Sequence, residues 1–253
     1  MKNTGTIRVG IGGWVFPPWR GTFYPNGLKQ AEELAHASRH VSAIEINGTF
    51  YHSGKPDSFR KWRDETPDGF VFSVKGPRFV THRRELATAG AGIAMFFSRG
   101  VLELGPKLGP VLWQLMPTTR FSPADMGAFL ELLPKESDGR PIRHVIQPRH
   151  PSFADPAFAE VLARHGAAAA EVDDADLPAS GAAAGFRYLR LRRCVEEEPA
   201  GYPPDSLDAW VERARKWAAE GTDVFLYFIN GAKIRAPHAA MALLERLSTK
   251  ATG

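Results

Sequence analysis

The stretch FVFSVKGPRFVTHRREL, residues 70–86, shows most clearly the strand pattern that recurs in this chain. A short apolar run ends in Lys75, a Gly-Pro pair interrupts the chain, and the polar segment THRRE follows. Large apolar side chains alternate along the run with Ser73 and Lys75, which is typical of a buried strand with two different faces. We therefore predict a strand over Phe70–Lys75 whose last side chain points into a site.

The same arrangement recurs along the sequence, and amphipathic helical patterns separate most of the apolar runs. The predicted strands are IRVGIGG near residue 7, VSAIEIN near 41, GFVFSVK near 69, GPVLWQL near 109, RHVIQPR near 143, GAAAAEVDD near 166, GFRYLRLR near 185 and DVFLYFIN near 223. The predicted helices are Lys29–His40, Asp57–Glu65, Arg83–Arg99, Pro123–Leu133, Asp155–His165, Pro204–Glu220 and Pro237–Ser248. Eight alternating units in 253 residues predict an α/β protein, a single-domain (β/α)8 TIM-like barrel over residues 1–253. A doubly wound open sheet is the alternative fold.

Local signals define several boundaries between these elements. Ser122 followed by Pro123 predicts a helix N-cap with a proline in the first turn, and Gly166 and Gly221 stand where two helices should end. The sixth connection, DADLPASGAAAG at residues 174–185, is too short and too rich in glycine for a full helix. We therefore expect a barrel with a reduced sixth helix.

Composition limits the class of protein. Hydrophobic residues make up 43% and charged residues 24%, as in ordinary globular domains. Cys194 is the single cysteine, so the chain forms no internal disulfide, and the first residues lack a signal-peptide pattern. The apolar stretch GAGIAMFFSRGVLELG is too short to span a bilayer and contains two charges. We expect a cytoplasmic protein without a membrane partner.

Alternation along the other strands places polar side chains on the inner face of the barrel. Barrel active sites lie at the carboxyl ends of the strands, so these side chains should meet at that end, which we call the mouth. The predicted inward polar residues are Glu45, Asn47, Ser73, Lys75, Gln114, Gln147, Arg149, Tyr188, Arg190 and Arg192, with Asn230 at the end of the less regular eighth strand. Lys75 should have Glu45, on the neighbouring strand, as its partner. The alternative is a structural ion-pair network that fills the end of the barrel.

Seven motifs, in order along nearly the whole chain, resemble those of the YecE-like proteins, the group called domain of unknown function seventy-two. They are VGIGGWVFPPWRGTFYP at 9–25, IEINGTFY at 44–51, FVFSVKGPRFVTHRREL at 70–86, LGPKLGPVLWQL at 104–115, RHPSF at 149–153, YLRL at 188–191 and DVFLYFIN at 223–230. The resemblance implies a TIM-like barrel, and it implies no established activity.

The chain departs from the family pattern at five positions near the predicted mouth. Gly12 and Gly48 stand where the resemblance implies serine, and Gln147 stands where it implies glutamate. Arg192 stands in place of a histidine and Ile229 in place of an asparagine. Because glutamine and arginine do not titrate near neutral pH, the resemblance implies altered or lost chemistry here if the family is catalytic.

Cations and aromatic residues gather near the predicted mouth. The cations at or just beyond strand ends are Lys75, Arg78, His82, Arg83, Arg84, Arg149, His150, Arg190, Arg192 and Arg193, and the aromatics after the first two strands are Trp14, Phe16, Trp19, Tyr24, Phe50 and Tyr51. Arginine forks match phosphate and carboxylate oxygens, and aromatic rings stack on bases. We therefore predict an anion-binding mouth lined by Trp14, Asn47, Tyr51, His82, Arg83, Gln114, Gln147, Arg149, Arg190, Arg192 and Asn230. The alternative is a set of solvated arginines and loop-packing aromatics.

Two functions follow from this mouth. The first is an enzyme, or a degenerate enzyme, acting on a phosphorylated small molecule or nucleic acid, with Glu45 as acid or base and Lys75 among the charge stabilisers. The second is a non-catalytic protein that binds nucleic acid or a phosphometabolite. A Schiff base at Lys75 is less favoured because Glu45 would keep it charged, and a metal is less favoured because no ligand pair has a helical spacing. The sequence specifies neither cofactor nor oligomeric state.

Overall fold

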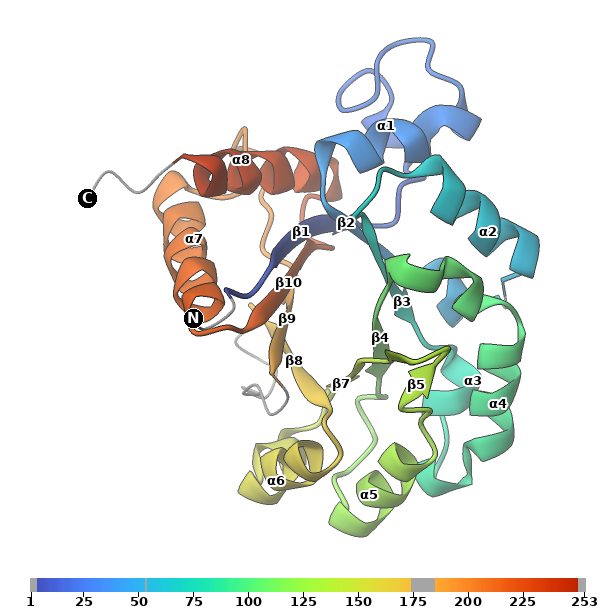
Figure 1. Ribbon diagram of the computed structural model, residues 1–253. Coiled ribbons are helices and arrows are strands. Elements are labelled where there is room, and N and C mark those ends of the chain that lie inside the picture. Colours follow the sequence, from blue (N-terminus) through green and yellow to red (C-terminus); the bar gives the residue numbers. More distant parts are fainter. Residues whose placement is uncertain (1–3, 53, 174–184, 250–253) are drawn as a thin grey trace.

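The computed structural model describes residues 4–52, 54–173 and 185–249. In this part of the chain eight parallel strands close into a barrel, and helices surround it (Figure 1). The strand order around the barrel is β1-β10-β9-β8-β7-β4-β3-β2. The predicted (β/α)8 TIM-like barrel is confirmed, and the alternative of a doubly wound open sheet is wrong.

Every predicted barrel strand has a counterpart in the structure. The barrel strands are β1 (Ile7–Gly12), β2 (Ala43–Ile46), β3 (Val71–Lys75), β4 (Leu108–Gln114), β7 (His144–Gln147), β8 (Ala168–Val172), β9 (Phe186–Leu191) and β10 (Asp223–Phe228). The α-helices are α1 (Glu33–His40), α2 (Pro56–Glu65), α3 (Arg78–Thr81), α4 (Gly90–Ser98), α5 (Pro123–Glu131), α6 (Pro156–Arg164), α7 (Pro204–Ala219) and α8 (Ala236–Ser248). Short 3-10 turns cover Pro17–Trp19, Gln30–Glu32, Gly48–Phe50, Leu86–Thr88, Val101–Lys107, Pro151–Ala154 and Lys233–Arg235.

The two faces of the strands pack into two separate cores, as the alternation predicts. Ile44, Phe72 and Leu189 belong to the core between barrel and helices. Ala43, Leu112, Val145, Ala168, Tyr188 and Tyr227 belong to the core inside the barrel. On β10 the inward side chains are Phe225 and Tyr227, and Ile229 continues this face beyond the strand. Asn230 follows Ile229 by one residue, so it is not on this inward face, and it is exposed.

The predicted helix Arg83–Arg99 exists, but its predicted start is wrong. The structure has the short helix α3, a turn, and then α4, which begins only at Gly90. The carboxylate of Asp125, at the start of α5, accepts the backbone N–H groups of Leu86 and Ala87. These two donors are thereby engaged outside a helix, and the helix starts after them.

The sequence also contains a hairpin that we did not predict. The antiparallel strands β5 (Glu136–Ser137) and β6 (Arg140–Pro141) pair between α5 and β7. Their turn is Asp138-Gly139, and both residues have positive φ angles, 49° and 71°. An Asp-Gly pair with two positive φ angles is a favoured two-residue hairpin turn, so the signal was present in the sequence.

The predicted helix ends are largely confirmed. Ser122 Oγ accepts the backbone N–H of Asp125 at 3.4 Å, with Pro123 in the first turn of α5. Gly166 and Gly221 follow α6 and α7 with φ angles of 64° and 86°, which glycine adopts without steric cost. The expected reduced sixth helix falls on residues 174–184, which lie outside the described residues.

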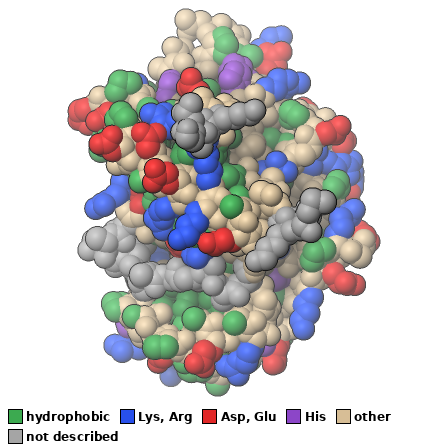
Figure 2. Space-filling view, turned by 60° about the vertical axis from the view of Figure 1, so that its left-hand side comes forward, with side chains coloured by type: hydrophobic (Ala, Val, Ile, Leu, Met, Phe, Trp, Pro, Cys, Tyr) green, Lys and Arg blue, Asp and Glu red, His purple; other side chains and the backbone are tan. Residues whose placement is uncertain are grey.

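Charges are mixed on the surface that Figure 2 presents, where Lys and Arg side chains are interspersed with Asp and Glu. This mixture agrees with the modest net charge of +4. Within the described residues, no helix is both long and apolar enough to cross a membrane.

Candidate functional site

Glu45 and Arg190 form a buried ion pair inside the barrel. Arg190 Nε and Nη2, from β9, each donate to one carboxylate oxygen of Glu45, from β2, at 2.9 Å. Glu45 is 0% exposed and Arg190 is 5% exposed. Such a two-bond contact between guanidinium and carboxylate fixes both groups in position.

The predicted pairing of Glu45 with Lys75 is therefore wrong, since Arg190 is the ion-pair partner of Glu45. The strand register gives the reason. Glu45 is in register with Ser73 on β3, so Lys75 lies two residues further towards the carboxyl end. Two residues of strand correspond to about 6.6 Å.

The surroundings of Glu45 hold it ionised. Burial by itself raises the pKa of this carboxyl, but the charge of Arg190 and its hydrogen bonds outweigh burial, and the pKa is lowered. The Tyr188 hydroxyl donates a further hydrogen bond to Glu45 Oε2 at 2.7 Å. Because it accepts three hydrogen bonds and has no exposed surface, this carboxylate is suited to fixing the positions of the side chains that donate to it. The prediction that Glu45 is an acid or base stays untested, and these surroundings argue against it.

Gln147 extends the cluster to β7. Its Oε1 accepts a hydrogen bond from Arg190 Nη1 at 2.5 Å, and the side chain is buried. This acceptor role fixes which end of the amide faces the arginine. Gln114, on β4, is in register with Gln147 and is half-buried. An amide at position 147 thus receives a guanidinium hydrogen bond without adding a second negative charge.

Lys75 lies near these groups without a hydrogen bond to any of them. Its Nζ is 4.1 Å from the centre of the Phe50 ring, and the residue is 8% exposed. Within the described residues no hydrogen bond or ion pair engages this ammonium group. Burial, aided by the charges of Arg190 and Arg149 and opposed by Glu45, lowers the pKa of Lys75 from 10.5 to about 8. The site thus contains an amine that loses its proton close to neutral pH.

Two further predicted residues lie at the rim of this cluster. The His82 ring is 5.4 Å from the Phe50 ring, and burial followed by the charges of Arg78, Lys75 and Arg149 lowers the His82 pKa. Arg149 itself is exposed. Tyr51 packs its ring against Phe50 but is largely exposed, so it stands outside the buried part.

Other predicted residues have local roles. Trp14 packs edge-on against Trp62 of α2 and against Phe72, on the helix-facing side of the barrel. Arg83 Nε donates to the carbonyl oxygen of Phe79, and Asn230 is exposed. The backbone N–H of Arg192 donates to the carboxylate of Asp173.

Two departures from the family pattern are in contact with each other. A Cβ atom on Gly12 would lie 3.3 Å from Ile229 Cγ2 and 3.3 Å from Asn47 Nδ2. The branched side chain at 229 thus occupies space beside residue 12, where only glycine fits without adjustment. Asn47 is held there by a hydrogen bond from Nδ2 to the carbonyl oxygen of Glu45 at 3.3 Å. This part of the mouth is consequently more apolar than the family pattern implies.

The sequence did not indicate that Phe50 is the neighbour of Lys75 or that Tyr188 donates to Glu45. Tyr188 shares its strand parity with Arg190, so its inward position could be predicted but its partner could not. Tyr202, which donates to Asp173 at 2.6 Å and accepts from the backbone of Arg193, was not predicted either. No group of three His, Cys, Asp or Glu side chains suited to a metal occurs among the described residues.

Taken together, the fold and these contacts define a TIM-type barrel with a buried, charged side-chain cluster at the carboxyl ends of its strands. The family model described as "Protein of unknown function DUF72" matches residues 8–253, so the chain belongs to this family and the resemblance in the motifs is confirmed. UPF0759 protein YecE of Escherichia coli is 31% identical over 150 residues, which are 58% of this chain and 50% of that protein. The match thus spans about half the length of this curated relative.

Solved structures share the fold. A DUF72 family protein of Thermotoga maritima has a TM-score of 0.77 at 21% identity, over 96% of this chain and 100% of that chain. One of Enterococcus faecalis has a TM-score of 0.76 at 15% identity, over 97% and 96%. A xylose isomerase-like TIM barrel/4-hydroxyphenylpyruvate dioxygenase fusion protein has a TM-score of 0.52 at 13% identity, over 96% of this chain and 44% of that chain. At these identities the likeness shows the fold alone.

Proposed function

We propose that the mouth binds a small phosphate-bearing molecule and that the chain is an enzyme, or an enzyme relative, acting on it. The observation that carries this proposal is Lys75, a residue that is only 8% exposed and whose ammonium group has no hydrogen-bond acceptor within the described residues. A buried cation without an acceptor is costly, and an anionic oxygen of a ligand would supply what is missing.

The balance of charge supports the same conclusion. Glu45 is the carboxylate of this cluster, and Arg190 already neutralises it through two hydrogen bonds. Lys75 and Arg149 then give the cluster an excess of positive charge, and the charge of Arg149 contributes to lowering the pKa of Lys75. An anion in front of Lys75 would relieve this repulsion. Arg190 would contribute its guanidinium group, which the ion pair with Glu45 and the hydrogen bond to Gln147 hold in position.

A second candidate function, covalent catalysis by Lys75, follows from the lowered pKa of this amine. A lysine with a pKa of about 8 is partly neutral near pH 8 and can attack a carbonyl carbon. In that reaction the amine nitrogen bonds to the carbonyl carbon, the oxygen leaves as water, and an imine forms. From the sequence this chemistry was less favoured, because Lys75 was expected to pair with Glu45; in the structure Glu45 pairs with Arg190 instead.

Calorimetric titration of the purified chain tests the anion site. The probes are inorganic phosphate, ribose 5-phosphate and a short single-stranded DNA, at constant ionic strength in chloride. We expect Lys75→Met and Arg149→Met to weaken binding of the favoured probe about tenfold or more, as for the loss of a charge-assisted hydrogen bond. Arg39→Met is the matched control, because this exposed arginine of α1 donates a hydrogen bond to a carbonyl oxygen of its own helix. Affinities that are the same in all four proteins would refute the proposal.

The probes also separate the two kinds of function. Ribose 5-phosphate binding that exceeds phosphate binding supports a small-molecule enzyme or its relative, because the site then recognises more than charge. DNA binding that falls steeply with salt, with little affinity for ribose 5-phosphate, supports the non-catalytic nucleic-acid protein instead. For covalent catalysis the test is reduction with borohydride in the presence of dihydroxyacetone phosphate. A mass adduct on Lys75 supports it, and an unmodified Lys75 peptide contradicts it.

A further inference from the structure

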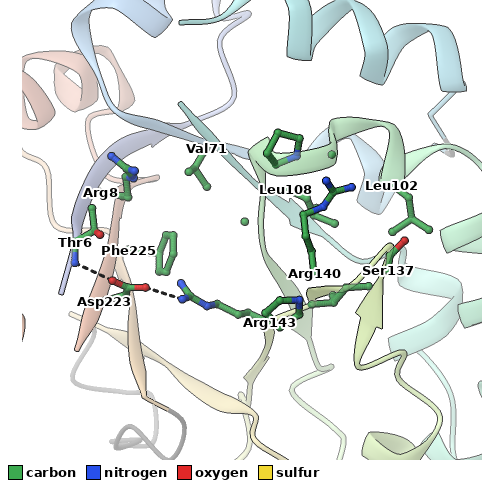
Figure 3. Close-up of a pocket in the computed structure, with 15 residues that line it drawn as sticks. Thr6, Arg8, Val71, Leu102, Leu108, Ser137, Arg140, Arg143, Asp223 and Phe225 are labelled. Carbon is green, nitrogen blue, oxygen red and sulfur yellow. Dashed lines mark hydrogen bonds and ion pairs between the residues drawn. The ribbon is translucent and has the colours of Figure 1, made fainter. Parts of the chain in front are cut away.

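A cavity of about 280 Å³ lies at the amino ends of the barrel strands, opposite the mouth (Figure 3). The first residues of β1, β3, β4 and β10 contribute to it, and so do the β5–β6 hairpin and the segment that leads into β7. Its polar lining residues are Thr6, Arg8, Ser137, Arg140, Arg143 and Asp223. The cavity thus combines three arginines with one carboxylate.

The carboxylate is fully engaged by two of its neighbours. Asp223 Oδ1 accepts the backbone N–H of Thr6 at 2.8 Å, and Oδ2 accepts a hydrogen bond from Arg143 Nη2 at 2.6 Å. Burial alone would raise the pKa of Asp223, but these two donors outweigh it and the pKa is lowered, so the group stays ionised. Asp223 therefore offsets the charge of Arg143 and leaves the other two arginines without a counter-charge in the cavity.

Arg8 is the first of these two arginines. It is half-buried on β1, in register with the inward-facing Phe225. Its positive charge acts on the Tyr227 hydroxyl inside the barrel, against the effect of burial, which raises the pKa of that group. Within the described residues, no hydrogen bond or ion pair engages the Arg8 guanidinium. Because a guanidinium group has five N–H donors, this half-buried side chain is able to donate hydrogen bonds to a bound anion.

Arg140 comes to the cavity on the hairpin. Its ion pair, to Asp138 in the adjacent turn, spans 3.5 Å between two exposed groups and is weak. Figure 3 shows Arg8 and Arg140 on opposite sides of the cavity, with Arg143 along one edge reaching Asp223. The hairpin turn of positive-φ residues holds Arg140 and Ser137 beside the barrel opening. Two cationic groups from separate elements thus border one space.

We infer that this cavity is a second binding site, which takes a small dianion with a phosphate or paired carboxylate groups. Guanidinium groups match the oxygen spacing of both. The volume is near the lower limit of small-molecule pockets, which suits a small ligand. Val71, Leu108 and Phe225 provide an apolar wall for a short carbon body. The inference is independent of the mouth, because no residue of the Lys75 cluster lines this cavity.

An amide NMR titration of the isotope-labelled chain tests the inference, with inorganic phosphate and with malonate as probes at constant ionic strength. We expect saturable shifts at Thr6, Ser137 and Gly139, which lie at the cavity or in its hairpin turn. Arg8→Met should weaken this response about tenfold or more and leave shifts near Lys75 unchanged. Arg149→Met, at the mouth, should do the reverse.

The outcomes separate the two sites. Loss of the hairpin shifts in Arg8→Met, with either probe, supports the inference. Shifts confined to the mouth, or hairpin shifts that persist unchanged in Arg8→Met, would overturn it. Should Arg8→Met fail to fold, Arg140→Met provides the same comparison, because Arg140 is half-exposed on the hairpin and carries no core packing.

Discussion

Replacing Lys75 with methionine should stabilise the folded protein at neutral pH. Methionine keeps most of the aliphatic length that packs near Phe50 and removes the charged group. Burial and neighbouring cations lower the pKa of this lysine from 10.5 to about 8, which means that the folded state disfavours its charge. A lowering of this size corresponds to about 3 kcal/mol, which is an upper value for the gain in unfolding free energy.

Lys107 is a matched control with the opposite expectation. It is 9% exposed, close to the 8% of Lys75, but its Nζ donates to the carbonyl oxygens of Arg63 and Thr66 at 2.6 Å each. A third hydrogen bond, at 3.1 Å, goes to Thr66 Oγ1. Lys107→Met leaves these acceptors unsatisfied and should cost about 1–3 kcal/mol. The two substitutions thus differ in the sign of their effect, because the Lys107 ammonium has hydrogen-bond acceptors and the Lys75 ammonium has none among the described residues.

The pH dependence identifies the cause of the gain. Between about pH 8 and 10.5 the unfolded chain binds more protons at Lys75 than the folded chain, so the wild-type protein gains stability as pH rises through this range. The advantage of Lys75→Met should therefore be largest at pH 7 and should approach zero near pH 10.5. Urea unfolding of wild type, Lys75→Met and Lys107→Met, followed by tryptophan fluorescence at both pH values, measures this. A loss of stability in Lys75→Met at pH 7, or a gain that does not change with pH, would refute the reasoning.

Two other outcomes follow from buried contacts. Arg190→Met leaves the Glu45 carboxylate buried without its ion-pair partner and should lower the free energy of unfolding by about 3–5 kcal/mol, and the double variant with Glu45→Gln should recover part of this loss. Urea unfolding of the two single variants and the double variant gives the coupling energy. A coupling energy below about 0.5 kcal/mol would contradict a shared pair. Gly231→Ala should destabilise by about 2 kcal/mol or more, because φ is 75° and the added Cβ would lie 2.3 Å from the carbonyl oxygen of Cys194. Gly48→Ala, with no atom within 4 Å of its added Cβ, is the control, and equal melting temperatures for these two glycine variants would count against the steric argument.

Much of the site could be predicted from single strands. Residues two apart on a strand share a face, so Glu45, Gln147 and Arg190 were assigned to the barrel interior, and their hydrogen bonds confirm it. Trp14 was grouped with them because it follows the first strand, but it packs against Trp62 on the outer side. A loop residue has no strand parity, so position along the chain does not indicate the direction of its side chain.

The number and spacing of apolar runs are local properties that eight strand–helix units repeat, so they were enough to predict the class of fold. Strand parity also predicted the inward position of Glu45, Gln147 and Arg190, but not that Arg149 and Asn230 are exposed. Which inward residues touch depends on the register and stagger of strands far apart in the chain, and these exist only in the folded barrel. Register placed Lys75 two residues beyond Glu45 and gave Glu45 to Arg190, 145 positions away. That choice of partner leaves the Lys75 ammonium without an acceptor in the part of the chain that the structure describes, and the function proposed for the mouth rests on this.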